Sequence, residues 1–336
     1  HLCHSDGLRP DGNCRACVVE IEGERTLAPS CCRTPAPGQK VRAQSPRARK
    51  SQDLVLELLL ADLPERGHKW NDGPVVVGAP APSPQSGQHG ELSAWAARLG
   101  VRVRPALTAL RRESPAPDLS HPAMAVNLDA CIQCNRCQRA CREAQGNDVI
   151  GLAFRGAHTQ VVFDLADPMG ASSCVACGEC VQACPTGALM PKSLSGSQKV
   201  DRSVDSVCPF CGIGCQIAYK VRDEKIVAVD GRPGPANDGR LCVKGRFGFD
   251  YAHHPARLTK PLIRKAGVTK DPDHLHRDLH WSEVFREASW DEALDFAAGK
   301  LFALRDTYGK KALAGFGSAK GSNEEAYLFQ KLVRTG

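Results

Sequence analysis

The sequence predicts an α+β chain built from several small domains. Its 336 residues are enough for two or three domains that each bury a core. The 17 cysteines fall into three groups, within residues 3–32, 131–184 and 208–242, and short strand-like and helical patterns alternate around them. Stretches rich in Pro, Gly and Ser separate the groups, so each group should belong to a module of its own.

The central group repeats one motif, C-x-x-C-x-x-C-x-x-x-C, and closes at Pro185. In bacterial ferredoxins, three thiolates of each run bind one 4Fe–4S cluster and the fourth binds the other cluster. We therefore predict two 4Fe–4S sites whose ligands cross between the runs, which makes the unit pseudo-symmetric. The first site takes Cys131, Cys134, Cys137 and Cys184, and the second takes Cys174, Cys177, Cys180 and Cys141.

Zinc and disulfide bonds are the alternatives for these cysteines. Structural zinc sites usually pair two C-x-x-C turns across a gap, whereas four thiolates packed into one short run, twice over, suit a cubane better. Disulfide frameworks are typical of short secreted chains, and no signal peptide is visible. Close cysteine groups in a chain of this length therefore indicate metal ligation in a reducing compartment.

Charge and hydropathy argue against two classes of function. The net charge of +7 is modest, and the basic run at 42–50 has few aromatic neighbours, which is typical of a solvated face rather than a nucleic-acid interface. No apolar run is long enough to span a bilayer. We predict a soluble, cytoplasmic protein with no nucleic-acid partner and no membrane span.

Residues 1–50 resemble a 2Fe–2S ferredoxin domain, a partial β-grasp fold. Its predicted ligands are Cys3, Cys14, Cys17 and Cys32. The first three lie on loops rich in Gly, Pro, Asp and Asn, a strand is predicted at 18–22, and the last follows a hairpin, so four thiolates can converge from a long loop and a strand end. A zinc site made from the same thiolates is the alternative.

The adjacent Cys31 and Cys32 cannot both bind one cluster without severe strain. In the domains that this segment resembles, the last ligand precedes a Pro at the spacing seen in Cys32-Arg33-Thr34-Pro35, so Cys32 is chosen and Cys31 stays the alternative. His1 and His4 flank the first ligand. Metal ligation by them is conceivable, but loop histidines packed over a cluster are the commoner case.

Residues 51–120 are predicted to be helical segments joined by a Pro- and Gly-rich linker. Helical patterns cover 53–61 and 91–99, and the stretch at 73–90 suits a mobile linker. The twin ferredoxin domain follows at 121–195.

A third four-cysteine site is predicted in a small β domain at 203–260. Its ligands are Cys208, Cys211, Cys215 and Cys242. Gly212 and Gly214 let the backbone turn closely around a cluster, and a strand–turn–strand pattern occupies 216–229. With this site, 16 of the 17 cysteines are assigned, and the last is the Cys31/Cys32 duplicate.

Residues 261–336 are predicted to begin an α/β domain. The spacing of Ser289 and Glu292 predicts a capping box that opens a helix to about Tyr308. A short strand at 312–316 follows, then a glycine loop and a helix from about Asn323. The loop glycines are Gly315, Gly317 and Gly321. A strand, a glycine loop and a helix N-terminus together make an anion-binding geometry, and an ordinary tight turn is the alternative.

Two runs allow the family to be named. The C-P-x-C-x-x-G-C run from Cys208 and the C-x-K-G-R run from Cys242, with the domains before them, resemble the large subunit of NAD-linked, molybdenum-dependent formate dehydrogenases. That subunit is close to the large iron–sulfur subunit of respiratory complex I. The resemblance implies that Lys244 lies between a cubane and the pterin and helps conduct the electron, the alternative being an ordinary surface lysine. It also implies that the three loop glycines contribute to a molybdopterin guanine dinucleotide site.

The resemblance further implies a function, cofactors and partners. The parent protein would oxidise formate to carbon dioxide at a molybdenum or tungsten bis-pterin centre. Electrons would pass from the third site through the twin cubanes to the 2Fe–2S cluster, and on to flavin- and NAD-binding diaphorase subunits of a hetero-oligomer. One 2Fe–2S and three 4Fe–4S clusters correspond to about 14 irons per chain.

Two features limit this resemblance. Some relatives bind an extra cluster through one His and three Cys, but His68 has no Cys near it, so that cluster should be missing. The chain begins at His1 and stops at Gly336 inside recognisable patterns, so we expect a fragment. The Cys or selenocysteine that binds the catalytic metal would lie beyond it, and no catalytic residue is predicted within the chain.

Two other functions fit the same motifs. One is an iron–sulfur subunit of the complex I or NAD-linked hydrogenase type, whose C-terminal domain is a relic without pterin. The other is a multi-cluster electron carrier that acts alone and oxidises no substrate.

Overall fold

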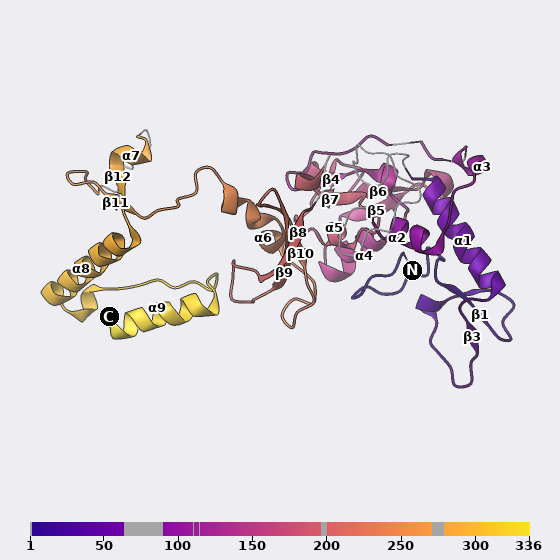
Figure 1. The fold of residues 1–336 in the computed structure, drawn as a ribbon, viewed down its shortest axis with the longest axis horizontal. Helices are drawn as coiled ribbons and strands as arrows, with labels where there is room; N and C mark the ends of the chain where they lie inside the picture. Colours follow the sequence, from indigo (N-terminus) through magenta and orange to yellow (C-terminus); the bar gives the residue numbers. More distant parts are fainter. Residues whose placement is uncertain (1, 64–89, 110, 114, 196–199, 271–278) are drawn as a thin grey trace. The chain divides into compact units, whose positions relative to one another are not determined.

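The structure is a computed structural model, shown in Figure 1. The described residues are 2–63, 90–109, 111–113, 115–195, 200–270 and 279–336. They form two units, one made of residues 1–208 and 213–250 and the other of 209–212 and 251–336, and each unit is described by itself. Short helices and short strands occur in both units, as the predicted α+β class requires.

The N-terminal module is a small antiparallel sheet with one long helix. β1 (Val18–Ile21) lies between β2 (Ala28–Pro29) and β3 (Val41–Arg42), so the predicted strand at 18–22 is confirmed. The apolar side chains of β1 are buried, and α1 (Pro46–Ala61) packs against this strand.

Helix α1 begins earlier than its apolar run predicts. A helix was expected over 53–61, but Ser45 caps it by accepting a hydrogen bond from the Ala48 N–H at 3.2 Å, and Pro46 occupies the first helical position. Residues 46–50 of the basic run therefore form the start of α1.

Two further helices complete this module. α2 (Gly90–Leu99) confirms the helix expected at 91–99, and α3 (Pro105–Thr108) is a single turn. A buried leucine cluster unites α2 with α1 and the N-terminal loop: Leu2, Leu56, Leu63 and Leu92. The predicted linker at 73–90, except Gly90, lies outside the described residues, as does His68.

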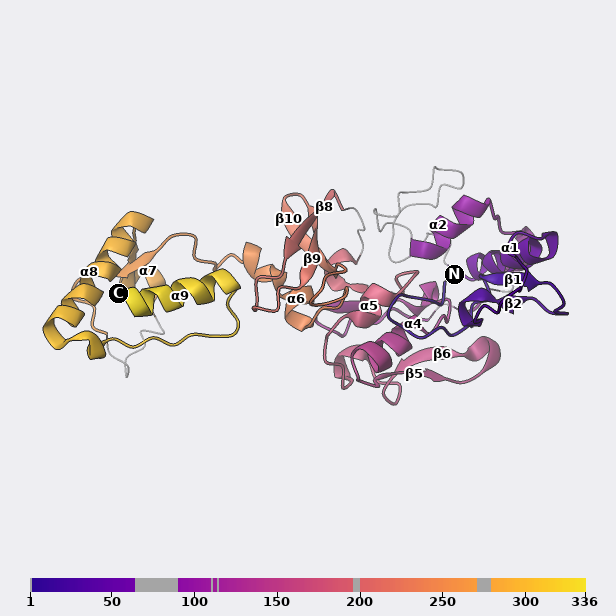
Figure 2. The ribbon, with the colours of Figure 1, turned by 90° about the horizontal axis from the view of Figure 1, so that it is seen from below.

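The twin module contains two antiparallel strand pairs and two short helices. β4 (Met124–Val126) pairs with β7 (Leu189–Pro191), and β5 (Ile150–Ala153) pairs with β6 (Gln160–Phe163), both antiparallel. Figure 2 shows β5 and β6 side by side. The helices are α4 (Arg136–Arg139), which continues as a π-helical turn at Ala140–Ala144, and α5 (Glu179–Ala183).

The two cysteine loops of the twin module adopt the same backbone conformation. Gln133 and Asn135 of the first loop have φ of 54° and 59°, and Ala176 and Gly178 at the matching positions of the second have φ of 55° and 75°. Three of these four residues are not glycine, so each loop holds a left-handed conformation that costs of order 1 kcal/mol per residue. Strain repeated at equivalent positions indicates that the loop shape itself is required.

A three-stranded antiparallel sheet follows the twin module. β9 (Gln216–Arg222) lies between β8 (Arg202–Val207) and β10 (Lys225–Gly231). This confirms the predicted strand–turn–strand pattern, whose turn at Asp223 and Glu224 has φ of 49° and 57°. α6 (Val243–Phe247) packs against β10.

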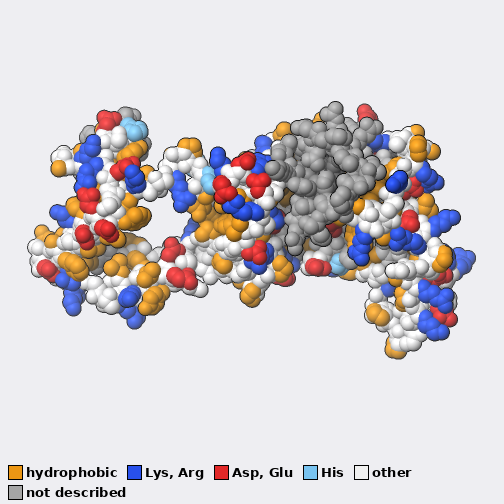
Figure 3. All heavy atoms as spheres, viewed as in Figure 1, with side chains coloured by type: hydrophobic (Ala, Val, Ile, Leu, Met, Phe, Trp, Pro, Cys, Tyr) orange, Lys and Arg blue, Asp and Glu red, His pale blue; other side chains and the backbone are white. Residues whose placement is uncertain are grey.

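The described residues of the second unit include one strand pair and three α-helices. β11 (Leu262–Arg264) pairs with β12 (Phe285–Glu287), and the helices are α7 (Trp281–Val284), α8 (Trp290–Tyr308) and α9 (Asn323–Thr335). No residue of α8 or α9 is buried, and hydrophobic side chains appear at the surface of this unit in Figure 3.

Two expectations for this unit are wrong. The segment at 312–316 is extended at Leu313, but within the described residues no strand pairs with it, so it lacks the hydrogen-bond ladder of a strand. Ser289 caps α8 by accepting from the Glu292 N–H, but the Glu292 carboxylate binds Arg286 and does not close the capping box. A complete capping box stands at the start of α9 instead.

Within the described part of the chain, no helix combines the length and apolar character needed to cross a bilayer.

Candidate metal centres

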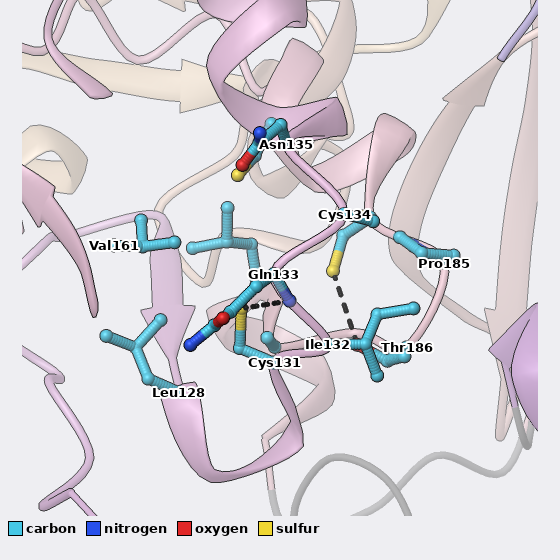
Figure 4. Close-up of a pocket in the computed structure, with 13 residues that line it drawn as sticks. Leu128, Cys131, Ile132, Gln133, Cys134, Asn135, Val161, Pro185 and Thr186 are labelled. Atoms are coloured by element: carbon cyan, nitrogen blue, oxygen red, sulfur yellow. Dashed lines mark hydrogen bonds between the residues drawn. The ribbon is translucent and has the colours of Figure 1, made fainter. Parts of the chain in front are cut away.

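One cavity of the twin module is lined by all four thiols of the first predicted set. Cys131, Cys134 and Cys137 come from the first loop, and Cys184 comes from the end of α5. Figure 4 shows Leu128, Val161 and Pro185 around the sulfurs of this loop. The Gln133 N–H points back at the Cys131 sulfur at 3.3 Å. A mainly apolar cavity with four sulfur donors fits a thiolate-bound cubane.

A second cavity is lined by all four thiols of the other set. Cys174, Cys177 and Cys180 come from the second loop, and Cys141 comes from the π-helical turn after α4. The Ala176 N–H lies 3.4 Å from the Cys174 sulfur, which matches the contact in the first loop. The eight thiols therefore line two cavities in groups of four, and their ligation of clusters stays a prediction.

Burial makes the thiolate forms of these cysteines costly without a positively charged metal. It raises the pKa of Cys131 to about 11 and that of Cys137 well above its ordinary value. The pKa of Cys180 is raised in the same way and for the same main reason. Because thiolates bind iron, cluster assembly would have to displace these protons.

The described His, Cys, Asp and Glu side chains include no group of three placed to share a single metal ion. The thiols surround cavities instead.

The N-terminal cysteines also converge in part. The Cys3 N–H donates to the Cys14 sulfur at 3.4 Å, and Cys3 is fully buried. Although burial opposes it, donation from the backbone N–H groups of Ala16, Cys3 and Leu2 holds the pKa of Cys14 below its ordinary value. A thiolate at Cys14 is thus favoured by its own loop.

The geometry does not distinguish Cys31 from Cys32 as the fourth ligand. The Cys31 sulfur lies 3.5 Å from that of Cys17, while a side chain at Gly12 would lie 2.9 Å from the Cys32 sulfur, so both face the cysteine loop. Burial and the neighbouring thiols raise the pKa of Cys31 to about 12. His4 is half-buried beside Cys3, and His1 lies outside the described residues.

The third predicted set is divided between the units. Within the first unit, the Cys208 N–H donates to the Cys215 carbonyl at 2.9 Å, and Gly245 of α6 approaches the Cys208 sulfur closely. Cys242 caps the start of α6 and is exposed, while Cys211 belongs to the second unit.

The remaining predicted site residues have mixed surroundings. Lys244 is exposed on α6. A Cβ at Gly315 would lie 2.7 Å from the Phe329 ring of α9, so close packing explains this glycine, and Gly317 faces the same ring at 3.4 Å. At the start of α9, the Glu325 carboxylate accepts from the Ser322 N–H at 2.6 Å, which places an acidic group beside the predicted anion site at Gly321. The pterin contacts stay a prediction.

Helix α4 ties the twin module to the N-terminal cysteine loop through two arginines. Arg136 donates to the Leu2 carbonyl at 3.3 Å and to Glu91 at 2.7 Å. Arg139 donates to the carbonyls of Cys3 and Arg9. Both guanidinium groups are buried.

Helix α5 ties the twin module to the third module in a matching way. Glu179 accepts from Arg246 at 3.0 Å and from the Leu241 N–H at 3.0 Å, and Arg246 also donates to the Cys177 carbonyl at 2.9 Å. A Cβ at Gly178 would lie 2.0 Å from Arg246, so only glycine admits this arginine.

Gln182 completes the second junction. Its side chain donates to the Gly239 carbonyl at 2.8 Å and accepts from the Gly231 N–H at 3.1 Å. Sequence reasoning missed all of these docking residues. The available signal was a charged residue directly before the third cysteine of each run, Arg136 and Glu179.

Comparison with known families assigns four domain types along the chain. Residues 1–46 match a 2Fe–2S iron–sulfur cluster binding domain, and residues 121–190 match the ferredoxin-like domain of NADH-quinone oxidoreductase subunit 3. Residues 201–254 match the molybdopterin oxidoreductase Fe4S4 domain, and residues 257–336 match molybdopterin oxidoreductase. Over most of its length the chain therefore resembles iron–sulfur and molybdopterin oxidoreductase domains. Its cofactor types therefore include 2Fe–2S and 4Fe–4S clusters.

Curated relatives match nearly the whole length of this chain. The NADPH-Fe(3+) oxidoreductase subunit alpha of Geobacter sulfurreducens is 32% identical, and an NADH-quinone oxidoreductase subunit of Rhizobium meliloti is 33% identical. A Staphylococcus haemolyticus protein named "Putative formate dehydrogenase" is 27% identical. Each alignment covers 99% of this chain and 35% of the relative, so the chain spans about a third of their length.

The solved structure of an NAD+-reducing NiFe-hydrogenase in its H2-reduced state is also similar. It aligns with 58% of this chain and 76% of its own chain, at TM-score 0.46 and 24% identity. This level of likeness supports no argument about function.

Proposed function

We propose that the parent protein is a formate dehydrogenase and that this chain is its electron relay. Formate would be oxidised to carbon dioxide at a molybdenum or tungsten bis-pterin centre, and the electrons would leave through a flavin- and NAD-binding partner subunit. The observation that carries the relay is the pair of cavities in the twin module, each lined by three thiols of one run and one of the other.

The four predicted ligand sets are part of this proposal. The two cavity sets would hold the twin cubanes, and the sets at Cys3 to Cys32 and Cys208 to Cys242 would hold the 2Fe–2S and the third 4Fe–4S cluster. The clusters supply one-electron transfer at potentials set by charge, hydrogen bonds and solvent exposure. The chain supplies thiolates, amide donors to sulfur such as the Gln133 N–H, and apolar walls that exclude water.

The junctions of the twin module support a relay along the chain. Arg139 contacts the backbone of Cys3, a predicted 2Fe–2S ligand, and Arg246 contacts the backbone of Cys177, a predicted cubane ligand. These contacts fix neighbouring ligand loops against each other. Rigid spacing between redox sites is what a relay requires of the protein around it.

Formate as the substrate is supported by one relative's name and by the resemblance of the C-P-x-C-x-x-G-C and C-x-K-G-R runs. Lys244, exposed beside Cys242, would help conduct the electron between the third cluster and the pterin.

The test uses the full-length protein with its partner subunits, purified without oxygen. We expect about one molybdenum or tungsten per chain, and cluster signals in electron paramagnetic resonance (EPR) that appear when formate alone is added. A protein with neither metal, or with clusters that formate leaves oxidised, would rule out formate dehydrogenation.

A second candidate is an NAD(P)H-linked relay that does not use formate. Two relatives favour it, because they are named for NADPH-Fe(3+) and NADH-quinone oxidoreduction and are more similar than the formate dehydrogenase relative. In this case NADH would reduce the clusters in the same preparation, and formate would not.

A further inference from the structure

We propose that Arg139 is the buried counter-charge of the N-terminal 2Fe–2S cluster and raises its reduction potential. The inference rests on the proposed ligation of that cluster by Cys3, Cys14, Cys17 and Cys32. Its structural basis is the contact between the Arg139 guanidinium and the carbonyl of Cys3, the ligand that lies deepest.

Arg139 is a buried cation held only by neutral groups. It is 9% exposed, and its two terminal nitrogens donate to the carbonyls of Cys3 and Arg9. Its Nε is buried without a hydrogen-bond partner, and among the described residues no carboxylate forms an ion pair with it. Burying an unpaired charge is expensive, so an anion close to the guanidinium is expected.

Gln182 shows that docking alone does not require this charge. Arg139 lies two residues after Cys137, and Gln182 lies two residues after Cys180, at the matching position of the second run. Gln182 joins its neighbouring module through a backbone carbonyl and a backbone N–H, and it does so as a neutral amide. The positive charge at Arg139 is therefore the feature that docking leaves unexplained.

A thiolate-bound iron–sulfur cluster supplies the missing anion. Four thiolates outweigh the charge of the iron–sulfide core, and reduction adds one more negative charge. A fixed cation nearby stabilises the reduced form more than the oxidised form, which raises the potential. At an effective dielectric constant of about 20, a unit charge about 12 Å from a cluster changes the ratio of its reduced to its oxidised form by about tenfold.

The charges near Arg139 determine whether each substitution should raise or lower the reduction potential. Glu143 interacts electrostatically with Arg139, but its carboxylate forms its ion pair with Arg9, at 3.3 Å. Arg136, the other buried cation of α4, is already paired with Glu91. Arg142 is exposed and paired with Asp148.

The experiment is a potentiometric titration of the cluster-loaded chain with dithionite as reductant, followed by EPR of each cluster. In R139Q we expect the N-terminal cluster to need about tenfold more reducing conditions at half-reduction, which is about 59 mV for a one-electron couple. R139K keeps the positive charge, so its N-terminal cluster should have a reduction potential close to that of the unmodified chain. The matched control R142Q removes the same charge from the surface and should leave the potential unchanged.

E143Q gives an independent test with the opposite sign, in case R139Q fails to assemble. Removing this carboxylate leaves the Arg139 charge less opposed, so the potential should rise. Three results would overturn the proposal. The potential of the N-terminal cluster could shift no more in R139Q than in R142Q, or the potentials of all clusters could shift equally in R139Q. The third is a fall in the potential of the N-terminal cluster in E143Q. Absence of a 2Fe–2S signal in the unmodified chain would instead contradict the proposed cluster ligation.

Discussion

The two halves of the twin module share one backbone but differ in charge. Each loop has left-handed residues at the same two positions and an amide that points at its first cysteine. Before the third cysteine, however, one half carries Arg136 and the other carries Glu179, and two residues after it one carries Arg139 and the other Gln182.

The difference shows that ligand geometry and docking are encoded separately. The cysteine spacing and the strained turns build two equal cavities, and the variable positions attach each half to a different neighbour. On the α5 side the buried charges cancel within one ion pair, Arg246 with Glu179. On the α4 side Arg136 has the half-exposed Glu91, and Arg139 has no carboxylate among the described residues.

Breaking the α5 junction should have the largest effect on stability. E179Q keeps an acceptor for the Leu241 N–H but leaves the Arg246 cation buried at 1% side-chain exposure without its partner. We expect a loss of about 3 kcal/mol in the free energy of unfolding. Chemical denaturation of the cluster-loaded chain without oxygen measures it.

The control for this prediction is E224Q. Glu224 forms an exposed ion pair with Arg202, and its loss should not change the denaturation midpoint measurably. Equal effects of E179Q and E224Q would show that the buried ion pair stabilises the fold no more than the exposed one.

Breaking the α4 junction at the matching position should have a smaller effect. Glu91 is 46% exposed at its side chain, so E91Q removes a solvent-screened partner, and Arg136 keeps the Leu2 carbonyl. We expect a loss of about 1 kcal/mol by the same denaturation measurement. A loss as large as that of E179Q would contradict the asymmetry between the halves.

The smallest expected effect is that of C31S on the N-terminal site. If Cys32 is the ligand, C31S keeps its full iron content and C32S loses about two irons per chain. Iron analysis of both variants decides the assignment, and the reverse result would make Cys31 the ligand.

Cysteine spacing predicted two sets of four thiols, and each set lines one cavity, because the local loops that the motif specifies fix the positions of the thiols. Helix ends were predicted where apolar periodicity is strong, as in α2, and missed where a Ser-Pro cap lies inside a basic run, as in α1.

Other features depend on contacts between distant segments, which no local pattern reveals. Arg246 fits only because Gly178, far away in the chain, lacks a side chain. Among the described residues no strand pairs with the segment at 312–316, and Gly315 and Gly317 of the glycine loop face the Phe329 ring.

The crossed ligation of the twin cubanes is tested most directly by counting iron in C131A, C184A and the double variant. Both thiols line one cavity, so each single variant and the double variant should lose the same cluster, about four irons per chain. If Cys184 instead served the run in which it lies, the double variant would lose about eight. That result would contradict the crossed assignment.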